Sequence, residues 1–171
     1  YVHLATGNYN GKTARIYTDV GILTANTLIG VDASAFFNLL SGYSDPPQWN
    51  KLAVAPLNLR ETIYLEINQE IAQAKAGKKA VIVAKMNSLL DKYVIAKLYE
   101  ASAAGVKIRL IVRGICVIRP GLPGISENIE VHSIVGRFLE HSRLFYFYNG
   151  GKEDVFISSA DWMPRNLNER V

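Results

Sequence analysis

The sequence has little that could cross-link it, hold a metal or cross a membrane. Its 171 residues include a single cysteine, Cys116, so no disulfide can form within the chain, which suits a reducing compartment. The cysteine and the three histidines show no metal-ligand spacing. No apolar run reaches the length of a membrane span, and no segment resembles a signal peptide. We therefore expect a soluble, cytoplasmic protein, with association to a membrane surface left open.

Several widespread functional motifs are also absent. The sequence has no Gly-x-x-x-x-Gly-Lys-Ser/Thr loop, which excludes a P-loop kinase, and no Gly-x-Ser-x-Gly elbow of a serine hydrolase. It has neither a basic helix nor an aromatic RNA-binding platform, so we expect no nucleic-acid partner. The net charge of +4 and the isoelectric point of about 9.2 fit an anionic ligand without requiring one.

The composition that remains is that of a protein with a packed core. Hydrophobic residues make up 49% of the chain and charged residues 20%. The length suffices for one domain, or for one domain and part of another. Residues 42–50, which include Asp45-Pro46-Pro47, are the best candidate for a linker. The first residues, Tyr1-Val-His-Leu, have the character of the middle of a strand, so we expect a fragment of a larger protein.

Short extended segments and one helix are predicted before this linker. Residues 1–5 and 13–23 have strand character, and the turn-rich residues 7–11 separate them. Residues 31–41 are predicted to form a short helix.

Helices and strands alternate regularly after the linker. A helix is predicted over residues 59–76, capped by Asn58 and ended by Gly77, and its apolar stripe consists of Ile63, Ile67, Ile71 and Ala74. A second helix is predicted over 89–104, ended by Gly105. Strands are predicted at 80–84, 106–112, 129–135, 143–148 and 154–158. The first is continuously apolar, which predicts burial on both faces, and the second is also predicted to be buried. The helix between them implies a right-handed parallel crossover. The pattern indicates an α/β fold.

His141 is the histidine whose neighbours best suit catalysis. In His141-Ser142-Arg143 the histidine and the arginine are two residues apart, so both point to one face of a strand. A histidine can transfer a proton near neutral pH or carry phosphate on nitrogen, and a cation beside it can stabilise a phosphoryl group. Glu140 or Asp161 could orient the ring. The alternative interpretation is a surface or capping histidine.

Basic residues follow two neighbouring strands at the points where the strands end. Arg113 follows the strand 106–112, while Lys85 and Asn87 follow the strand 80–84. Ligands of α/β sheets bind at the carboxyl ends of strands, and arginine can hold two phosphate oxygens at once. The pair of strand ends therefore predicts a phosphate site. The alternatives are a surface ion pair for Arg113 and a helix cap for Asn87.

Candidate residues also occur near the start of the chain. His3 precedes the turn Gly7-Asn8, and turns of this kind offer backbone N–H groups to an anion, which makes Asn8 a candidate as well. Tyr17 and Asp19 alternate on one face of a strand. Tyr17 could stack on a nucleotide base, although ordinary strand packing explains it equally well.

Six blocks of the sequence carry a family resemblance. The blocks are Tyr1–Asn10, Lys12–Asp19, Lys85–Leu89, Leu110–Cys116, Ser133–Arg143 and Ser158–Asn166. Together and in this order they strongly resemble the bacterial polyphosphate kinase 1 family, over nearly the whole chain.

The resemblance implies a phospholipase-D-like fold, in which a mixed sheet is flanked by helices. Residues 1–50 would be the tail of a first such catalytic domain, and residues 51–171 a second one truncated at its C-terminal end. The implied activity is reversible transfer of the ATP γ-phosphate onto inorganic polyphosphate through a phosphohistidine, with Mg²⁺. ATP or ADP and polyphosphate would be the partners, and the full-length enzyme would be a homo-oligomer.

The resemblance also assigns individual residues. Tyr17, Arg113 and His141 match positions that contact ATP in the family, and His141 would face the phosphohistidine from the second half of the site. His3 would be an accessory residue. The family's nucleophilic histidine and its magnesium-associated arginines map upstream, so we expect no metal ligand in this chain and no activity from it alone. Two alternatives stay open: a phospholipase-D-type phosphodiesterase and a non-enzymatic polyanion-binding module.

Overall fold

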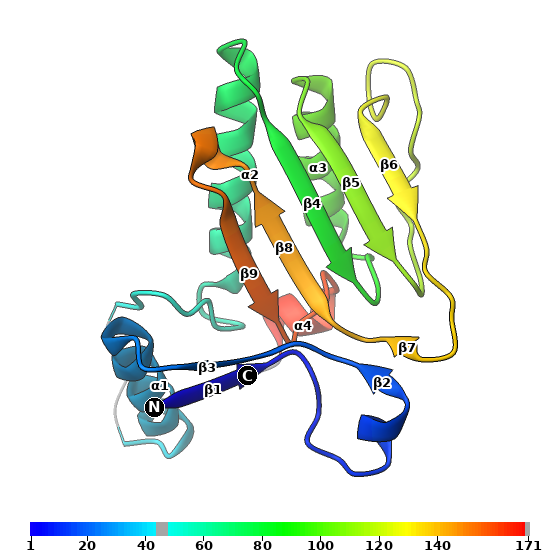
Figure 1. Cartoon of the computed structure of the whole chain (residues 1–171). Helices are drawn as coiled ribbons and strands as arrows, with labels where there is room; N and C mark the ends of the chain where they lie inside the picture. The colour runs from blue at the N-terminus through cyan, green and yellow to red at the C-terminus, as the bar shows by residue number, and fades with distance from the viewer. Residues whose placement is uncertain (44–47, 170–171) are drawn as a thin grey trace.

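The computed structural model describes residues 1–43 and 48–169, and it has two parts. A five-stranded sheet backed by helices forms the larger part, and a smaller unit with a two-stranded ribbon and a helix lies beneath it (Figure 1). The linker prediction at Asp45-Pro46-Pro47 falls outside the described residues. None of the described helices has the combination of length and apolar character that crossing a bilayer requires.

The large sheet is mixed, as expected, with the strand order β6-β5-β4-β8-β9. The neighbours β4 and β5, and β5 and β6, are parallel, while β8 pairs antiparallel with both β4 and β9. The strands are β4 (Val81–Met86), β5 (Lys107–Val112), β6 (Ile129–His132), β8 (Arg143–Phe147) and β9 (Asp154–Ser158).

Two helices cover one face of this sheet, α2 (Leu59–Lys75) and α3 (Lys92–Ala103) (Figure 1). The predicted stripe of α2 is confirmed, because Ile63, Ile67 and Ile71 are buried in the core and Ala74 packs against it. Burial of β4 and β5 on both faces is wrong. Alternate residues of these strands face away from the helices and are partly or fully exposed, since no described element covers that side.

The glycines predicted to end two helices are confirmed, whereas the predicted cap of α2 and the predicted start of α3 are wrong. Gly77 and Gly105 follow the two helices with φ of 70° and 99°, which glycine adopts without strain. Asn58 does not cap α2 with its side chain; its Oδ1 accepts from the N–H of Val54 instead, at 2.7 Å. The helix α3 begins later than predicted, because the Asp91 carboxylate accepts from the second and third N–H groups of the helix.

The smaller unit departs most from the prediction. Strand β1 (Val2–Ala5) pairs antiparallel with β3 (Gly21–Thr24). The expected single strand over 13–23 is wrong: the segment divides into a 3₁₀ turn (Thr13–Arg15), β2 (Tyr17–Thr18) and the start of β3. Helix α1 (Thr27–Leu40) starts four residues before the predicted position, because the Asn26 side chain caps it by accepting from Leu28 and Ile29 N–H.

Three short elements were not predicted: β7 (Leu139–Glu140), a 3₁₀ turn (Asn149–Gly151) and α4 (Pro164–Asn168). Of these, β7 matters for the site, because it pairs in parallel with β2 of the smaller unit. This pairing joins the start of the chain to the segment that leads into β8.

Candidate active site

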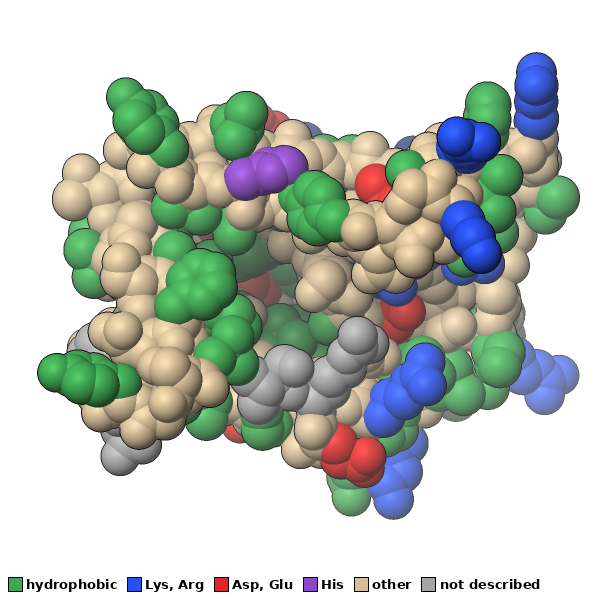
Figure 2. Space-filling model, turned by 90° about the horizontal axis from the view of Figure 1, so that it is seen from below, with side chains coloured by type: hydrophobic (Ala, Val, Ile, Leu, Met, Phe, Trp, Pro, Cys, Tyr) green, Lys and Arg blue, Asp and Glu red, His purple; other side chains and the backbone are tan. Residues whose placement is uncertain are grey.

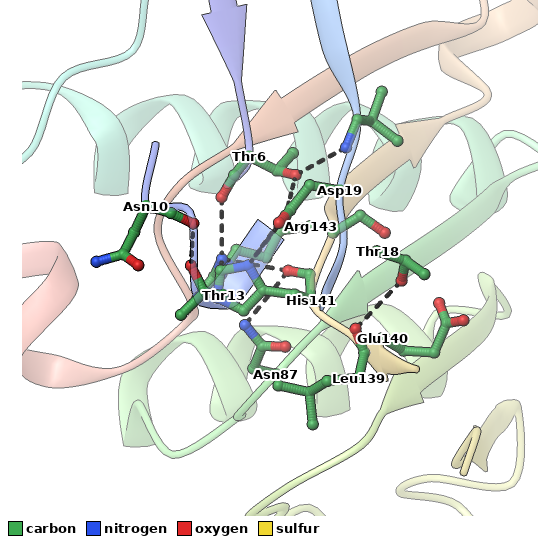
Figure 3. A network of polar contacts seen from close by, with 12 residues as sticks. Thr6, Asn10, Thr13, Thr18, Asp19, Asn87, Leu139, Glu140, His141 and Arg143 are labelled. Atoms are coloured by element: carbon green, nitrogen blue, oxygen red, sulfur yellow. Dashed lines mark hydrogen bonds and ion pairs between the residues drawn. The ribbon is translucent and has the colours of Figure 1, made fainter. Parts of the chain in front are cut away.

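His141 lies where the β2–β7 pair meets the start of β8 (Figure 3). The backbone N–H groups of His141 and Ser142 both donate to the carbonyl oxygen of Thr18, at 3.1 and 3.0 Å. His141 is 7% exposed. The smaller unit therefore sets the position of this histidine, although His141 belongs to the larger part of the chain.

The ring of His141 is oriented by Asp19. Its Nδ1 lies 2.9 Å from Oδ1 of Asp19, and the hydroxyl of Thr6 donates to the same carboxylate oxygen at 2.8 Å. The ring of Tyr17 packs against the imidazole at 4.7 Å between centroids. The expectation that Glu140 or Asp161 orients His141 is wrong, because Asp19, 122 residues earlier in the sequence, occupies that position.

Arg143 lies on the other side of the ring and contacts it, as the two-residue spacing predicted. Its Nη1 is 3.4 Å from Nε2 of His141 and donates to the carbonyl oxygen of Thr6 at 3.2 Å. Asp161 accepts from Nε and Nη2 of Arg143, at 3.1 and 3.2 Å. The two hydrogens of Nη1 are accepted by the carbonyl oxygens of Thr6 and His141, at 3.2 Å each, so Nε2 keeps its lone pair. Because the Asp19 carboxylate can only accept, the ring nitrogen beside it is the donor. The ring proton is then on Nδ1 and is donated to Asp19.

Asn87 connects this cluster to Arg113. Its backbone N–H donates to Asp161 at 2.7 Å. Its side-chain amide donates to the carbonyl oxygen of His141 at 3.5 Å, a contact drawn in Figure 3. Its Oδ1 accepts from Nε of Arg113 at 2.7 Å. The two terminal nitrogens of Arg113 make no hydrogen bond with any described residue. Arg113 can therefore present two N–H donors to an anion, while Asn87 positions it.

Lys85 is bound within the protein. Its Nζ donates to the carbonyl oxygen of Ser142 at 3.0 Å and to the Ser142 hydroxyl at 2.6 Å, and it lies 3.2 Å from the carboxylate of Glu140. Lys85 thus contacts the residues on both sides of His141, and it adds positive charge to the site.

His3 and Asn8 are not part of this network. His3 is exposed and contacts the Tyr9 hydroxyl at 3.0 Å. Asn8 is exposed in the loop after β1, where its carbonyl oxygen accepts from the N–H of Asn10 at 2.9 Å. The structure brings together Tyr17, Lys85, Asn87, Arg113 and His141, and leaves the other two candidates outside.

Sequence reasoning gave no role to Thr6 and did not connect Asp19 with His141. The only available signal was the alternation of Tyr17 and Asp19 on one strand face, which shows that they share a side but not what they face. Thr6 is 2% exposed, and nothing in its local sequence distinguishes it from an ordinary turn residue.

The site residues of this chain do not fit a magnesium ion. Each nearby carboxylate already pairs with a basic side chain: Asp19 with His141, Asp161 with Arg143 and Glu140 with Lys85. Within the described ranges, no cluster of three potential metal ligands occurs. The oxygen-rich shell that Mg²⁺ requires is therefore not offered by these side chains.

Two family models match the chain. "Polyphosphate kinase C-terminal domain 1" matches residues 1–46, and "Polyphosphate kinase C-terminal domain 2" matches residues 52–171. The chain belongs to the polyphosphate kinase family. The resemblance seen in the sequence blocks is thereby confirmed.

Individual polyphosphate kinases agree with this assignment. The protein of Halalkalibacterium halodurans is 60% identical over 171 residues and that of Lactiplantibacillus plantarum 59%, and each match covers the whole chain but 24% of the relative. The crystal structure of polyphosphate kinase from Porphyromonas gingivalis superposes with a TM-score of 0.94 at 52% identity, covering 98% of this chain and 26% of that one. The mixed α/β fold is therefore shared with a solved polyphosphate kinase, and the chain spans only part of such an enzyme.

Proposed function

We propose that this chain forms one side of the active site of a kinase that transfers the γ-phosphoryl group of ATP reversibly onto inorganic polyphosphate through a phosphohistidine. The observation that carries the proposal is the single hydrogen-bonded network that joins Asp19, His141 and Arg113 through Asn87. The relatives are named polyphosphate kinases, which favours this activity over a diester hydrolase or a polyanion-binding module. The nucleophilic histidine is expected outside residues 1–171.

The proposed reaction has two displacements at phosphorus. In the first, the nucleophilic histidine nitrogen attacks the γ-phosphorus, an N–P bond forms, the bond to the β–γ bridging oxygen breaks, and ADP leaves. In the second, a terminal oxygen of polyphosphate attacks, a P–O bond forms and the N–P bond breaks. Such transfers depend mainly on positioning and on stabilising the phosphate charge.

His141 is suited to move a proton during these displacements. With Nδ1–H bound to Asp19, its Nε2 can accept a proton from an entering phosphate hydroxyl and return it to a departing oxygen in the reverse reaction. The Asp19 carboxylate stabilises the imidazolium that forms. Tyr17 restricts rotation of the ring and stays partly exposed, which leaves it room to contact the nucleotide.

Arg113 is the proposed phosphate-binding residue. Its free terminal nitrogens can hold two phosphate oxygens, and its Nε–H···Oδ1 bond to Asn87 fixes the plane of the guanidinium. Arg143 has its donors directed to Asp161, Thr6 and His141, so we assign it to positioning. The two arginines thus have different roles, although both belong to the network around His141.

The test is His141→Gln in the full-length kinase, assayed for ATP-dependent growth of polyphosphate. Glutamine keeps a donor and much of the volume but cannot shuttle a proton near neutral pH. We expect kcat to fall by about 10²–10⁴-fold and one limb of the pH–rate profile to disappear. His132→Gln, at an exposed histidine, is the matched control. An unchanged rate in folded His141→Gln would contradict the proposal, as would release of alcohol from a diester instead of phosphoryl transfer.

The isolated 171-residue chain offers a second check. Because the covalent step needs a nucleophile that we expect elsewhere in the polypeptide, the chain alone should not couple ATP consumption to polyphosphate growth. Measurable coupled turnover by this chain would show that the covalent intermediate forms on one of its own residues.

A further inference from the structure

An apolar cavity of about 320 Å³ lies between the smaller unit and the large sheet, and none of the His141 network lines it. Its walls include Leu4, Ile22 and Ile29 from the smaller unit, and Ile63 and Phe156 from α2 and β9. Figure 2 shows that this underside of the molecule is hollowed, with hydrophobic side chains around the hollow and acidic side-chain atoms, drawn in red, visible inside it.

Glu66 on α2 lines the same cavity without a partner. It is 9% exposed, its Oε2 is buried, and its carboxyl group makes no hydrogen bond with any described residue. Glu70, one turn later, is also buried but accepts from the backbone N–H groups of Val81 and Asn149. A buried carboxylate with no donor is costly, so the cavity lacks a group that Glu66 would bind.

The charges around Glu66 indicate which kind of hydrogen-bond donor suits its carboxyl group. Burial first, and then the negative charges of Asp154 and Glu70, raise the pKa of Glu66, and only Lys152 acts in the opposite direction. A cationic donor placed at Glu66 would satisfy its hydrogen bonds and offset this excess of negative charge. A neutral donor would satisfy the hydrogen bonds alone.

The smaller unit indicates where that group comes from. Its apolar side chains are largely uncovered, with Ile22 43%, Val31 49% and Phe37 68% exposed. The residues matched to C-terminal domain 1 number fewer than a typical domain contains, and relatives are much longer than this chain, which spans 24% of the Halalkalibacterium protein. The smaller unit forms one wall of the cavity, is matched to domain 1 and has no hydrophobic core of its own among its described residues. The rest of domain 1 is therefore the most direct source of side chains that cover this wall.

We propose that the Glu66 cavity receives a segment of the same polypeptide from the remainder of C-terminal domain 1. The segment packs an apolar side chain between Ile22 and Phe156 and pairs an arginine or lysine with Glu66. This contact makes the filled cavity an interface that fixes domain 1 against domain 2. It holds the segment between β2 and β3, which bears Asp19, at a fixed place relative to His141.

Photo-crosslinking identifies the occupant in the full-length kinase. p-Benzoylphenylalanine replaces Ile22, and the same group at Tyr93, which is 58% exposed on α3, is the control. We expect the Ile22 probe to crosslink within one polypeptide to a peptide outside residues 1–171, as read by mass spectrometry of mixed isotope-labelled and unlabelled protein. Crosslinks between two copies, crosslinks confined to residues 1–171, or no crosslink would overturn the proposal.

Thermal melting tests the charge pair independently. Glu66→Gln and Glu66→Leu are compared in the full-length kinase with Glu61→Gln, which removes the same charge at an exposed position of the same helix. If a cation is buried against Glu66, both Glu66 variants lower Tm, by roughly 6 °C or more for leucine, and Glu61→Gln barely changes it. A rise in Tm for Glu66→Leu would mean that the carboxyl group has no cationic partner. If a Glu66 variant fails to fold, the crosslinking result decides.

Discussion

The two parts of this molecule are stabilised in different ways. All described hydrophobic side chains that are buried belong to residue 54 or later, and all of them except Val54 form one core between the large sheet and its helices. In residues 1–43 the buried side chains are Thr6 and Asp32, and both are polar. The larger part therefore has a core of its own, whereas the smaller unit depends on hydrogen bonds to other segments.

Those two polar residues connect the parts. The Asp32 carboxylate accepts from the N–H groups of Lys51 and Leu52 at 2.6 and 2.9 Å, which ties α1 to the segment before α2. Thr6 contacts Asp19 through its hydroxyl and Arg143 through its carbonyl oxygen. The smaller unit thus positions the side chains of His141 and Arg143, while the larger part provides the sheet that carries them.

The largest effect is expected where the two parts meet, at Asp19. Asp19→Asn in the full-length kinase should lower kcat by about 10²-fold or more, because an amide cannot stabilise the imidazolium and can reverse the tautomer of His141. Glu140→Gln is the control, since Glu140 pairs with Lys85 and not with the ring. Steady-state kinetics and circular dichroism measure the effect. Equal losses in the two variants would contradict the assignment of Asp19.

The next comparison separates core from surface. Leu98→Ala, at a fully buried side chain of α3, should lower the free energy of unfolding by about 2–5 kcal/mol. Leu23→Ala, at a side chain that is 80% exposed, should change it by less than about 0.5 kcal/mol in the 171-residue chain. Urea titrations give both values. Similar losses from the two substitutions would show that the smaller unit has a core after all.

A smaller effect should arise from phosphate binding within the larger part alone. Arg113→Ala should weaken ATP binding by about 1.5–3 kcal/mol, and Arg113→Lys should restore only part of it, because lysine lacks the two-pronged geometry. Asn87→Ala should act in the same direction through the lost bond to Arg113. Calorimetric titration with a non-hydrolysable ATP analogue measures the affinities, and unchanged binding in folded Arg113→Ala would make that residue structural.

The smallest expected effect is acid sensitivity at Asp32. Burial raises the pKa of Asp32, but hydrogen bonds from Lys51, Leu52 and Asn50 outweigh it and lower the pKa below the ordinary 3.8. Asp32 therefore contributes stability that is fully present above the unfolded-state pKa and is lost as the pH falls through the lower folded-state pKa. Asp32→Asn keeps one acceptor, so it should cost about 1.5 kcal/mol near pH 7. Melting curves from pH 7 to pH 2 should show this difference shrinking below about pH 4. A difference that does not vary with pH would rule out the charge of Asp32 as its origin.

Prediction from the sequence succeeded where short-range patterns decide the outcome. The bounds of β9 are as expected, α2 and β8 each end one residue early, and glycines close α2 and α3, because period, apolar content and glycine act within one element. It failed over residues 13–23, where β2 has only two residues and is held by β7 through a contact 121 residues away. Likewise, Asn58 binds the N–H of Val54 instead of capping α2, whereas Asp91 caps α3, and only the packed structure decides which side chain acts as a cap.

The residues of the candidate site likewise could be predicted only where short-range patterns identify them. His141, Arg113, Lys85 and Asn87 could be predicted because each lies within two residues of the end of a strand of the large sheet, at the edge where α/β sheets bind ligands. The sequence by itself thus determined the family, the α/β core and which side chains are chemically capable. The tertiary structure alone decided that Asp19 orients His141, that Asp161 pairs with Arg143, and that His3 lies outside. These outcomes depend on the register between distant segments, which no local pattern encodes.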